Sequence, residues 1–316
     1  MSAGRNCPLS YRYAPQSLQG PAFIHTETLY VVGGLYGNEA ALSTVVEAYT
    51  AEPGPKHLIF NGDFNWFDID PASFSRINRA VLSYDAIRGN VETELAPRDL
   101  ALSDAGCGCG YSDSVDDGVV QRSNAIMQTL AATATAFPAL QARLAGLPMW
   151  KRIDVAGVPI AVVHGDAQSL AGWGFAAENL ALDAHQTQLR TWFEASGVRI
   201  FACSHTCEAV FHTVEDSRGR DCLIANNGAA GMPNFAAGQA GLLTRIATTP
   251  YANGPVASRA RIDDLFIEAV PIAYDQPRWH ADFLAQWPSG SPAHESYWKR
   301  ITDGPTRASA PKPAWP

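Results

Sequence analysis

Four apolar segments of the sequence end in a residue that can bind a metal cation. Asp63 follows "IFNG", Asn90 follows "AIRG", His164 follows "AVV" and His205 follows "FACS". In open α/β sheets, ligands gather at the carboxyl ends of strands because the loops there converge. Two imidazoles, a carboxylate and an amide oxygen suit Zn, Fe or Mn better than Ca, which prefers oxygen ligands alone. Each residue alone also fits a turn, a helix cap or a core position, so the prediction of a metal site depends on all four together.

The surrounding sequence predicts the elements that would carry these residues. Apolar segments alternate with helical patterns that begin at a polar capping residue, which is typical of parallel βαβ units. A later segment, 150–166, predicts a hairpin around Gly157. The other predicted strands lie within 28–34, 57–63, 85–90, 199–205, 221–228 and 263–275, and the predicted helices within 38–52, 70–83, 119–137 and 280–288.

Composition limits the class of protein. The chain has 316 residues, of which 47% are hydrophobic, enough for one large α/β domain. A formal charge of -8 argues against a nucleic-acid polymer or an anionic membrane as partner, because both favour clustered Lys and Arg. No segment approaches the roughly 18 uninterrupted apolar residues of a membrane helix. The N-terminal residues include Arg and Pro where a signal peptide needs an apolar run, so we expect a cytoplasmic protein whose six cysteines are reduced.

The segment "VVGGLYGN", residues 31–38, lacks the ligands that its position suggests. It follows an apolar strand and leads into a helix that begins at Asn38, as ligand-bearing turns of α/β enzymes do. The turn nevertheless contains no carboxylate and no imidazole.

The order of the motifs resembles that of a known family. The series "NGD", "RGNVE", "VVHGD", "SHTC" and "NNGAAGMP", within residues 28–235, is similar to the motifs of the calcineurin-like metallophosphoesterases. The resemblance implies a four-layer αββα sandwich, in which two mixed sheets pack face to face with helices outside. It also implies that the loop after the last motif lies near the metal centre.

We predict one calcineurin-like domain over residues 28–290, with an N-terminal extension, 1–27, and a C-terminal tail, 291–316. An insert near 96–118 is rich in Cys, Gly and Asp and has no helical or strand period, so it is predicted to be a surface loop or lid. Cys107 and Cys109 are too close for the usual zinc C-x-x-C arrangement. The Asp residues of the insert are further possible ligands: Asp104, Asp113, Asp116 and Asp117.

The departures from the family motifs fall mainly on one of the two metal sites that the resemblance implies. The site formed by Asp63, Asn90, His164 and His205 is complete. The other site would share Asp63, but Gly34 and Tyr36 occupy the positions of its Asp and His, and Cys207 replaces its second His. Either Tyr36 and Cys207 bind a second metal as phenolate and thiolate, or they fill space beside a single ion.

Two other departures concern catalysis. Trp66 replaces the later Asp of the second motif, and Val91 occupies the position of a catalytic His. Protonation of the leaving group would then fall to water or to a residue such as His212 or Asp166.

The leading hypothesis is metal-assisted hydrolysis of a small phosphomonoester, phosphodiester or nucleotide. The cofactor would be a divalent or trivalent ion of Fe, Mn or Zn, one or two per chain, and the partner a small phosphorylated substrate. The first alternative is a catalytically degenerate protein that binds a phosphorylated ligand. The second is an iron centre at which Tyr36 and Cys207 support redox chemistry.

Overall fold

The computed structural model describes residues 3–5, 7–96, 105–236 and 238–305. Within these residues, twelve strands form two six-stranded mixed sheets. The first sheet has the spatial order β1 (Ile24–Thr26), β5 (Trp150–Val155), β6 (Val158–Val163), β7 (Ile200–Cys203), β9 (Asp221–Asn227), β8 (Ala209–Glu215). The second has the order β11 (Ser258–Ile262), β12 (Leu265–Ile272), β10 (Gly241–Ala247), β2 (Thr28–Val32), β3 (Lys56–Asn61), β4 (Asp85–Ile87).

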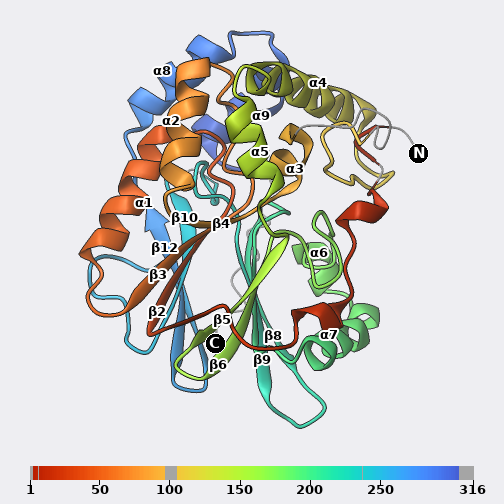
Figure 1. Cartoon of the computed structure of the whole chain (residues 1–316), viewed down its shortest axis with the longest axis vertical. Helices are drawn as coiled ribbons and strands as arrows, with labels where there is room; N and C mark the ends of the chain where they lie inside the picture. Colours follow the sequence, from red (N-terminus) through yellow and green to blue (C-terminus); the bar gives the residue numbers. More distant parts are fainter. Residues whose placement is uncertain (1–2, 6, 97–104, 237, 306–316) are drawn as a thin grey trace.

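The two sheets pack face to face between helices, so the predicted four-layer αββα sandwich is confirmed (Figure 1). Side chains of β2 show how the strand separates the layers, because successive residues of a strand point to opposite faces. Leu29 and Val31 join the core between the sheets, whereas Tyr30 and Val32 join the core beneath the helices. An apolar run without polar alternation is therefore what a strand buried on both faces requires.

Helices cover the outer faces of both sheets. Those over the second sheet include α1 (Glu39–Ala51) and α2 (Pro71–Val81), and those over the first include α6 (Ala177–Leu180) and α7 (Asp183–Ser196) (Figure 1). The remaining helices are α3 (Asn90–Leu95), α4 (Asp117–Ala134), α5 (Pro138–Ala145), α8 (Gln276–Gln286) and α9 (Pro292–Asp303), with 3-10 helices η1 (Leu9–Tyr11) and η2 (Pro15–Leu18).

Polar caps fix the starts of α1 and α2. Asn38 Oδ1 accepts from Ala41 N at 2.9 Å, and Asp70 Oδ1 accepts from Ser73 N at 2.8 Å.

Parallel pairing brings the predicted ligands together. In the second sheet β2, β3 and β4 are parallel, and in the first sheet β6, β7 and β9 are parallel. The turns that follow β3, β4, β6 and β7 contain Asp63, Asn90, His164 and His205, respectively. All four residues therefore leave strands at carboxyl ends, where binding sites form in this class of sheet.

The structure also contains elements that the sequence analysis did not predict. Strands β8, β10 and β11 are among them. The sequence of β10 includes Arg245, which is only 1% exposed and forms ion pairs with Glu52 at 2.6 Å and Glu268 at 2.7 Å. A buried charge is tolerated in this strand because acidic partners reach it from α1's end and from β12.

Both terminal segments contribute to the folded unit. Residues 24–26, within the predicted N-terminal extension, form β1, which pairs in parallel with β5. Residues 292–303, within the predicted C-terminal tail, form α9, which packs against α4 and buries Ala293 and Ile301. Residues 306–316 of the predicted tail lie outside the described residues.

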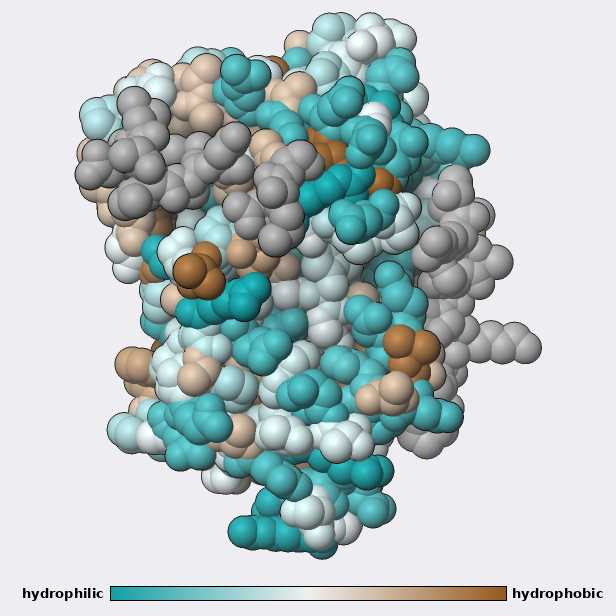
Figure 2. All heavy atoms as spheres, turned by 90° about the vertical axis from the view of Figure 1, so that its right-hand side faces the viewer, coloured by the Kyte–Doolittle hydropathy of each residue, from teal (hydrophilic) through white to brown (hydrophobic). Residues whose placement is uncertain are grey.

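The face shown in Figure 2 is mainly hydrophilic, with hydrophobic residues in small separate groups. Isolated exposed hydrophobic residues are normal on a protein surface. Among the helices that the structure describes, none has the length and apolar character that crossing a bilayer would require.

Candidate metal centre

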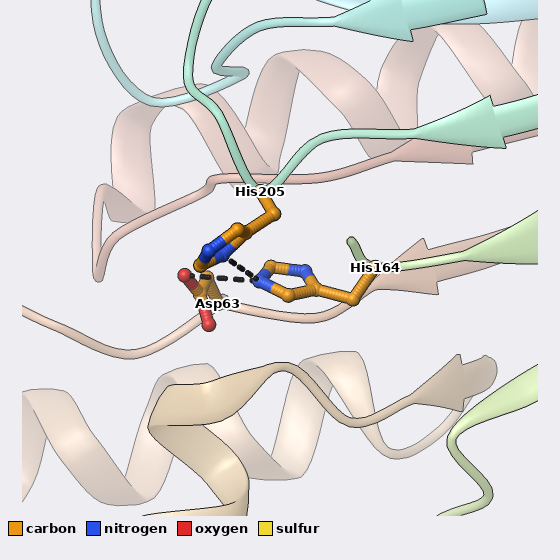
Figure 3. A group of neighbouring side chains, drawn as sticks. All are labelled: Asp63, His164 and His205. Carbon is orange, nitrogen blue, oxygen red and sulfur yellow. Dashed lines mark hydrogen bonds and ion pairs between the residues drawn. The ribbon is translucent and has the colours of Figure 1, made fainter. Parts of the chain in front are cut away.

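Three side chains from different strand ends converge in the buried interior. The ligand atoms of Asp63, His164 and His205 all lie within 4.8 Å of one another (Figure 3). His164 Nε2 is 3.3 Å from Asp63 Oδ2 and 3.2 Å from His205 Nδ1. These side chains follow β3, β6 and β7, so both sheets contribute to the group.

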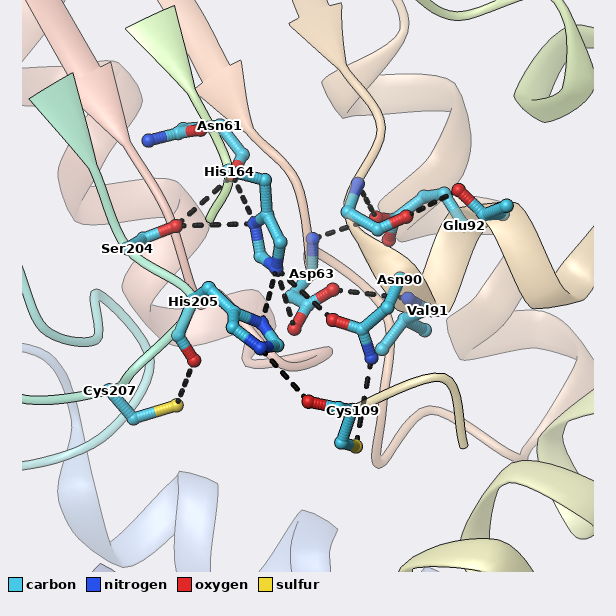
Figure 4. Close-up of polar contacts among 12 residues, drawn as sticks. Asn61, Asp63, Asn90, Val91, Glu92, Cys109, His164, Ser204, His205 and Cys207 are labelled. Carbon is cyan, nitrogen blue, oxygen red and sulfur yellow. Dashed lines mark hydrogen bonds and ion pairs between the residues drawn. The ribbon is translucent and has the colours of Figure 1, made fainter. Parts of the chain in front are cut away.

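Asn90 completes the group from the start of α3. Its Oδ1 lies 3.2 Å from His164 Nε2 (Figure 4). Its Nδ2 donates to the carbonyl of Cys107 at 2.9 Å. Because the amide nitrogen is held by that carbonyl, the amide oxygen faces the centre of the group. The structure thus brings together all four residues of the predicted intact site.

Backbone carbonyls orient the two imidazoles. His164 Nδ1 lies 2.9 Å from the carbonyl oxygen of Asn61, and His205 Nε2 lies 3.1 Å from that of Cys109. A carbonyl only accepts, so these ring nitrogens carry the protons in the neutral rings. The other nitrogens, His164 Nε2 and His205 Nδ1, then direct lone pairs at each other.

Four acceptor atoms consequently meet at one point: a carboxylate oxygen, an amide oxygen and two imidazole nitrogens. Acceptor atoms cannot form hydrogen bonds with one another, whereas a cation between them would bind to all four. The donor set and the carbonyl partners behind each imidazole match those of transition-metal and zinc sites. The residues therefore fit a metal ion such as Zn, Fe or Mn.

The charges of these groups depend on one another. Burial opposes ionisation of Asp63, but the neighbouring His164 lowers the pKa of the carboxyl below its usual value. Burial opposes protonation of His164, but Asp63 raises the pKa of this imidazole. Burial and then the charge of His164 lower the pKa of His205 to about 3. The surroundings thus favour one positive charge beside Asp63, which a metal ion would provide.

Glu92 holds the turn that carries Asp63. Its carboxylate accepts from the backbone N–H groups of Asp63 at 2.7 Å, Phe64 at 3.1 Å and Asn65 at 3.2 Å, and from that of Gly89 at 3.0 Å. Burial, and then the nearby Asp63 charge, raise the pKa of Glu92 to about 7. One buried side chain therefore fixes the turn after β3 relative to the start of α3.

Strained backbone is concentrated around the group. Of five non-glycine residues with positive φ among those described, three are Tyr36 (φ 56), Asp63 (φ 51) and Cys207 (φ 58). Such conformations are uncommon for residues with a Cβ and tend to occur at functional sites. Close packing adds a constraint at Gly89, where a Cβ would lie 2.2 Å from Asp63 Oδ1.

Comparison with known proteins supports the architecture. No protein-family model matches the sequence, and no curated protein matches it. Among solved structures, the match to hypothetical protein PH1004 from Pyrococcus horikoshii OT3 covers 90% of this chain and 100% of that one, with a TM-score of 0.58 and 12% identity. The match to a metallophosphoesterase from Sphaerobacter thermophilus covers 88% of this chain and 100% of that one, with a TM-score of 0.54 and 14% identity. The chain has a calcineurin-like phosphoesterase fold.

In this phosphoesterase fold, Tyr36 and Cys207 contact each other. The Tyr36 hydroxyl lies 2.7 Å from Cys207 Sγ, and Arg300 Nη2 on α9 donates to the Cys207 carbonyl at 2.6 Å. Burial raises the pKa of both the phenol and the thiol. The converging ligand atoms found among the described residues do not include Cys207 Sγ. A second metal ion bound by Tyr36 and Cys207 would have to replace the hydrogen bond between these two side chains.

The loop after β9 supports the glycine turn that lacks ligands. Ala230 N and Gly231 N donate to the carbonyls of Gly33 and Gly34, each at 2.9 Å. Asn227 Nδ2 also donates to the Gly33 carbonyl, at 3.0 Å. The segment "NNGAAGMP" therefore holds "GGLYGN" in place beside the centre.

The Cys-rich insert reaches the candidate metal centre through its backbone. The Cys107 carbonyl accepts from Asn90, and the Cys109 carbonyl accepts from both His205 and Trp173 Nε1, the latter at 3.0 Å. These carbonyl contacts could not be predicted from the sequence, because a backbone group leaves no signal in residue type. Of the candidate Asp ligands in the insert, Asp116 caps α4, Asp117 pairs with Arg5, Asp113 is exposed, and Asp104 lies outside the described residues.

A small pocket of about 60 Å³ opens onto the centre. Trp66 and Trp173 line it, together with Tyr111 and Tyr297. The two suggested general acids lie elsewhere. Asp166 accepts from three backbone N–H groups of its own loop, and His212 on β8 lies 3.4 Å from Gln186 Oε1 and lines a different cavity.

Proposed function

We propose that this protein is a metal-dependent phosphoesterase that hydrolyses a small phosphorylated substrate. The observation that carries the proposal is the convergence of Asp63, Asn90, His164 and His205 at strand ends of a calcineurin-like phosphoesterase fold. The fold alone is compatible with other functions, so the proposal depends on the site.

A cation at the four ligands would supply Lewis acidity and charge compensation for a phosphoryl group. The chain's own residues would keep this centre rigid. The carbonyls of Asn61 and Cys109 hold the imidazoles, and Val91 N donates to Asp63 Oδ1 at 3.2 Å. Fixed ligands avoid reorganisation during the reaction.

We propose one Fe, Mn or Zn ion at this site in each chain. The contact between Tyr36 and Cys207 favours a single ion, because each group already has a hydrogen-bond partner. A second ion would have to replace the hydrogen bond between these two groups, and both would have to lose protons although burial raises their pKa values.

The test is hydrolysis of a panel of phosphomonoesters and phosphodiesters by chelator-treated protein, before and after addition of Mn, Fe, Zn or Mg. We expect turnover that requires the added metal. Turnover unaffected by chelation would contradict the proposal.

Ligand binding without turnover is the second candidate. It is favoured by Val91 and by the absence of His212 and Asp166 from the pocket lining. In that case the same compounds would raise the melting temperature of the metal-loaded protein without being consumed.

A further inference from the structure

The pocket beside the proposed metal site has room for little more than a phosphoryl group. Its volume is about 60 Å³, whereas one water molecule needs roughly 10–15 Å³ of such a cavity. Pockets that enclose drug-sized ligands are much larger, about 300–1,000 Å³. A nucleoside therefore has no space inside it, and ester substituents must lie at the mouth.

Aromatic side chains form a large part of the walls. Trp66 is buried, whereas Tyr111, Trp173 and Tyr297 are half-buried. Such surfaces favour an apolar or aromatic ester group over a hydroxyl-rich or charged one.

No Lys or Arg is among the residues that line this pocket in the described part of the chain. Arginine and lysine are the usual partners of a phosphate dianion. Arg300 lies behind the lining, on the Cys207 carbonyl, and two acidic residues, Glu92 and Glu208, lie close to Asp63 and Cys207, respectively. The charged side chains around the pocket therefore give this site no excess of positive charge.

The net charge of the loaded site follows from its ligands. One divalent ion with the Asp63 carboxylate leaves a single net positive charge. A second divalent ion held by Tyr36 as phenolate and Cys207 as thiolate would leave the same net charge. A phosphodiester carries one negative charge and balances it, whereas a phosphomonoester near pH 8 carries two.

From the small volume, aromatic walls and single net charge, we propose that the site selects small phosphodiester monoanions over phosphomonoester dianions. This inference rests on the proposed phosphoesterase function, which it narrows. An uncompensated charge is disfavoured in a pocket with apolar walls, so the monoester should bind and react less well.

The test compares methyl p-nitrophenyl phosphate with p-nitrophenyl phosphate at pH 8, using the full chain loaded with Mn²⁺. The two compounds share a leaving group and differ by one methyl ester group, which removes one negative charge. We expect kcat/KM to be at least about tenfold higher for the diester. Equal values, or a preference for the monoester, would overturn the inference.

Two variants isolate the effect of charge. Tyr297→Arg places a cation in the wall and should reduce the diester preference severalfold, whereas Tyr297→Gln, which adds no charge, should retain it. A preference that is the same in both variants would count against the charge argument.

A binding measurement distinguishes failure of this inference from failure of the proposed function. Calorimetry with dimethyl phosphate and methyl phosphate at pH 8 needs no turnover. Tighter binding of dimethyl phosphate supports monoanion selection even if neither nitrophenyl ester is hydrolysed. Tighter or equal binding of methyl phosphate overturns it.

Discussion

His164 and His205 face each other through ring nitrogens 3.2 Å apart, with ring planes at 62°, and each ring has a backbone carbonyl at its other nitrogen. Two lone pairs directed at one point, beside a carboxylate, define a place for a cation.

Loss of an imidazole should abolish metal binding. We expect His164→Ala to lower metal affinity by more than about 100-fold, since even outer partners of ligands contribute roughly 10–100-fold. Elemental analysis and calorimetry measure this effect, and turnover should fall with it. His212→Ala is the matched control, because His212 lines a different cavity. Full metal content and activity in His164→Ala would contradict the assignment of His164 as a metal ligand.

The insert should act through its carbonyls rather than its thiols. Trp173→Phe removes one of the two hydrogen bonds to the Cys109 carbonyl and should lower metal affinity by roughly tenfold. Cys109→Ser leaves that carbonyl in place and should change affinity by no more than about twofold. A metal titration on both variants checks the difference. A larger loss in Cys109→Ser would indicate that the thiol, which lies 3.7 Å from the amide nitrogen of Asn90, contributes to the site.

Metal content tests the state of the altered site. We expect one ion per chain in the wild type, and the same content in Tyr36→Phe and Cys207→Ser, because these groups contact each other. Elemental analysis of protein purified without chelator gives the number. Two ions in the wild type, falling to one in either variant, would show that Tyr36 and Cys207 hold a second metal.

Asp68 should make stability depend on pH. The side chain is buried, Oδ1 accepts from Trp66 N at 2.9 Å, and Oδ2 has no hydrogen-bond partner among the described residues. Burial raises its pKa from 3.8 to about 7. The folded state therefore holds a proton that the unfolded state has lost, and stability falls as pH rises between these values.

Asp68→Asn removes this titration while leaving an acceptor for Trp66 N. We expect the unfolding free energy of the variant minus that of the wild type to increase by about 3 kcal/mol from pH 5 to pH 8. Denaturant unfolding at both pH values measures it. A difference between the two proteins that does not change with pH would contradict the assignment.

Helix α9 should stabilise the loop that carries Cys207. Arg300→Ala removes the bond to the Cys207 carbonyl and should lower the unfolding free energy by roughly 1.5–3 kcal/mol. The neighbouring Lys299 is exposed, so Lys299→Ala should stay within about 0.5 kcal/mol of wild type. If the two variants lose equal stability, the contact has no specific role.

Much of this site could be predicted because its signals are local. Each of Asp63, Asn90, His164 and His205 follows an apolar strand, and apolar residues without alternation indicate burial on both faces. Parallel strands of one sheet end at the same edge, so the positions in the chain implied that Asp63 lies near Asn90 and that His164 lies near His205. The two pairs meet because the two sheets pack face to face.

The tertiary structure alone decided which groups surround the ligands. The Cys109 carbonyl contacts His205, which is 96 residues away along the chain, and Arg300 contacts Cys207, which is 93 residues away. Such contacts depend on how an irregular insert and a terminal helix pack, and neither leaves a periodic pattern in the sequence. The identities of Tyr36 and Cys207 allowed either a second metal site or simple packing, and their mutual contact arises only because two loops from different sheets meet. Residue type and order thus determined the candidate ligands, whereas long-range packing determined their surroundings.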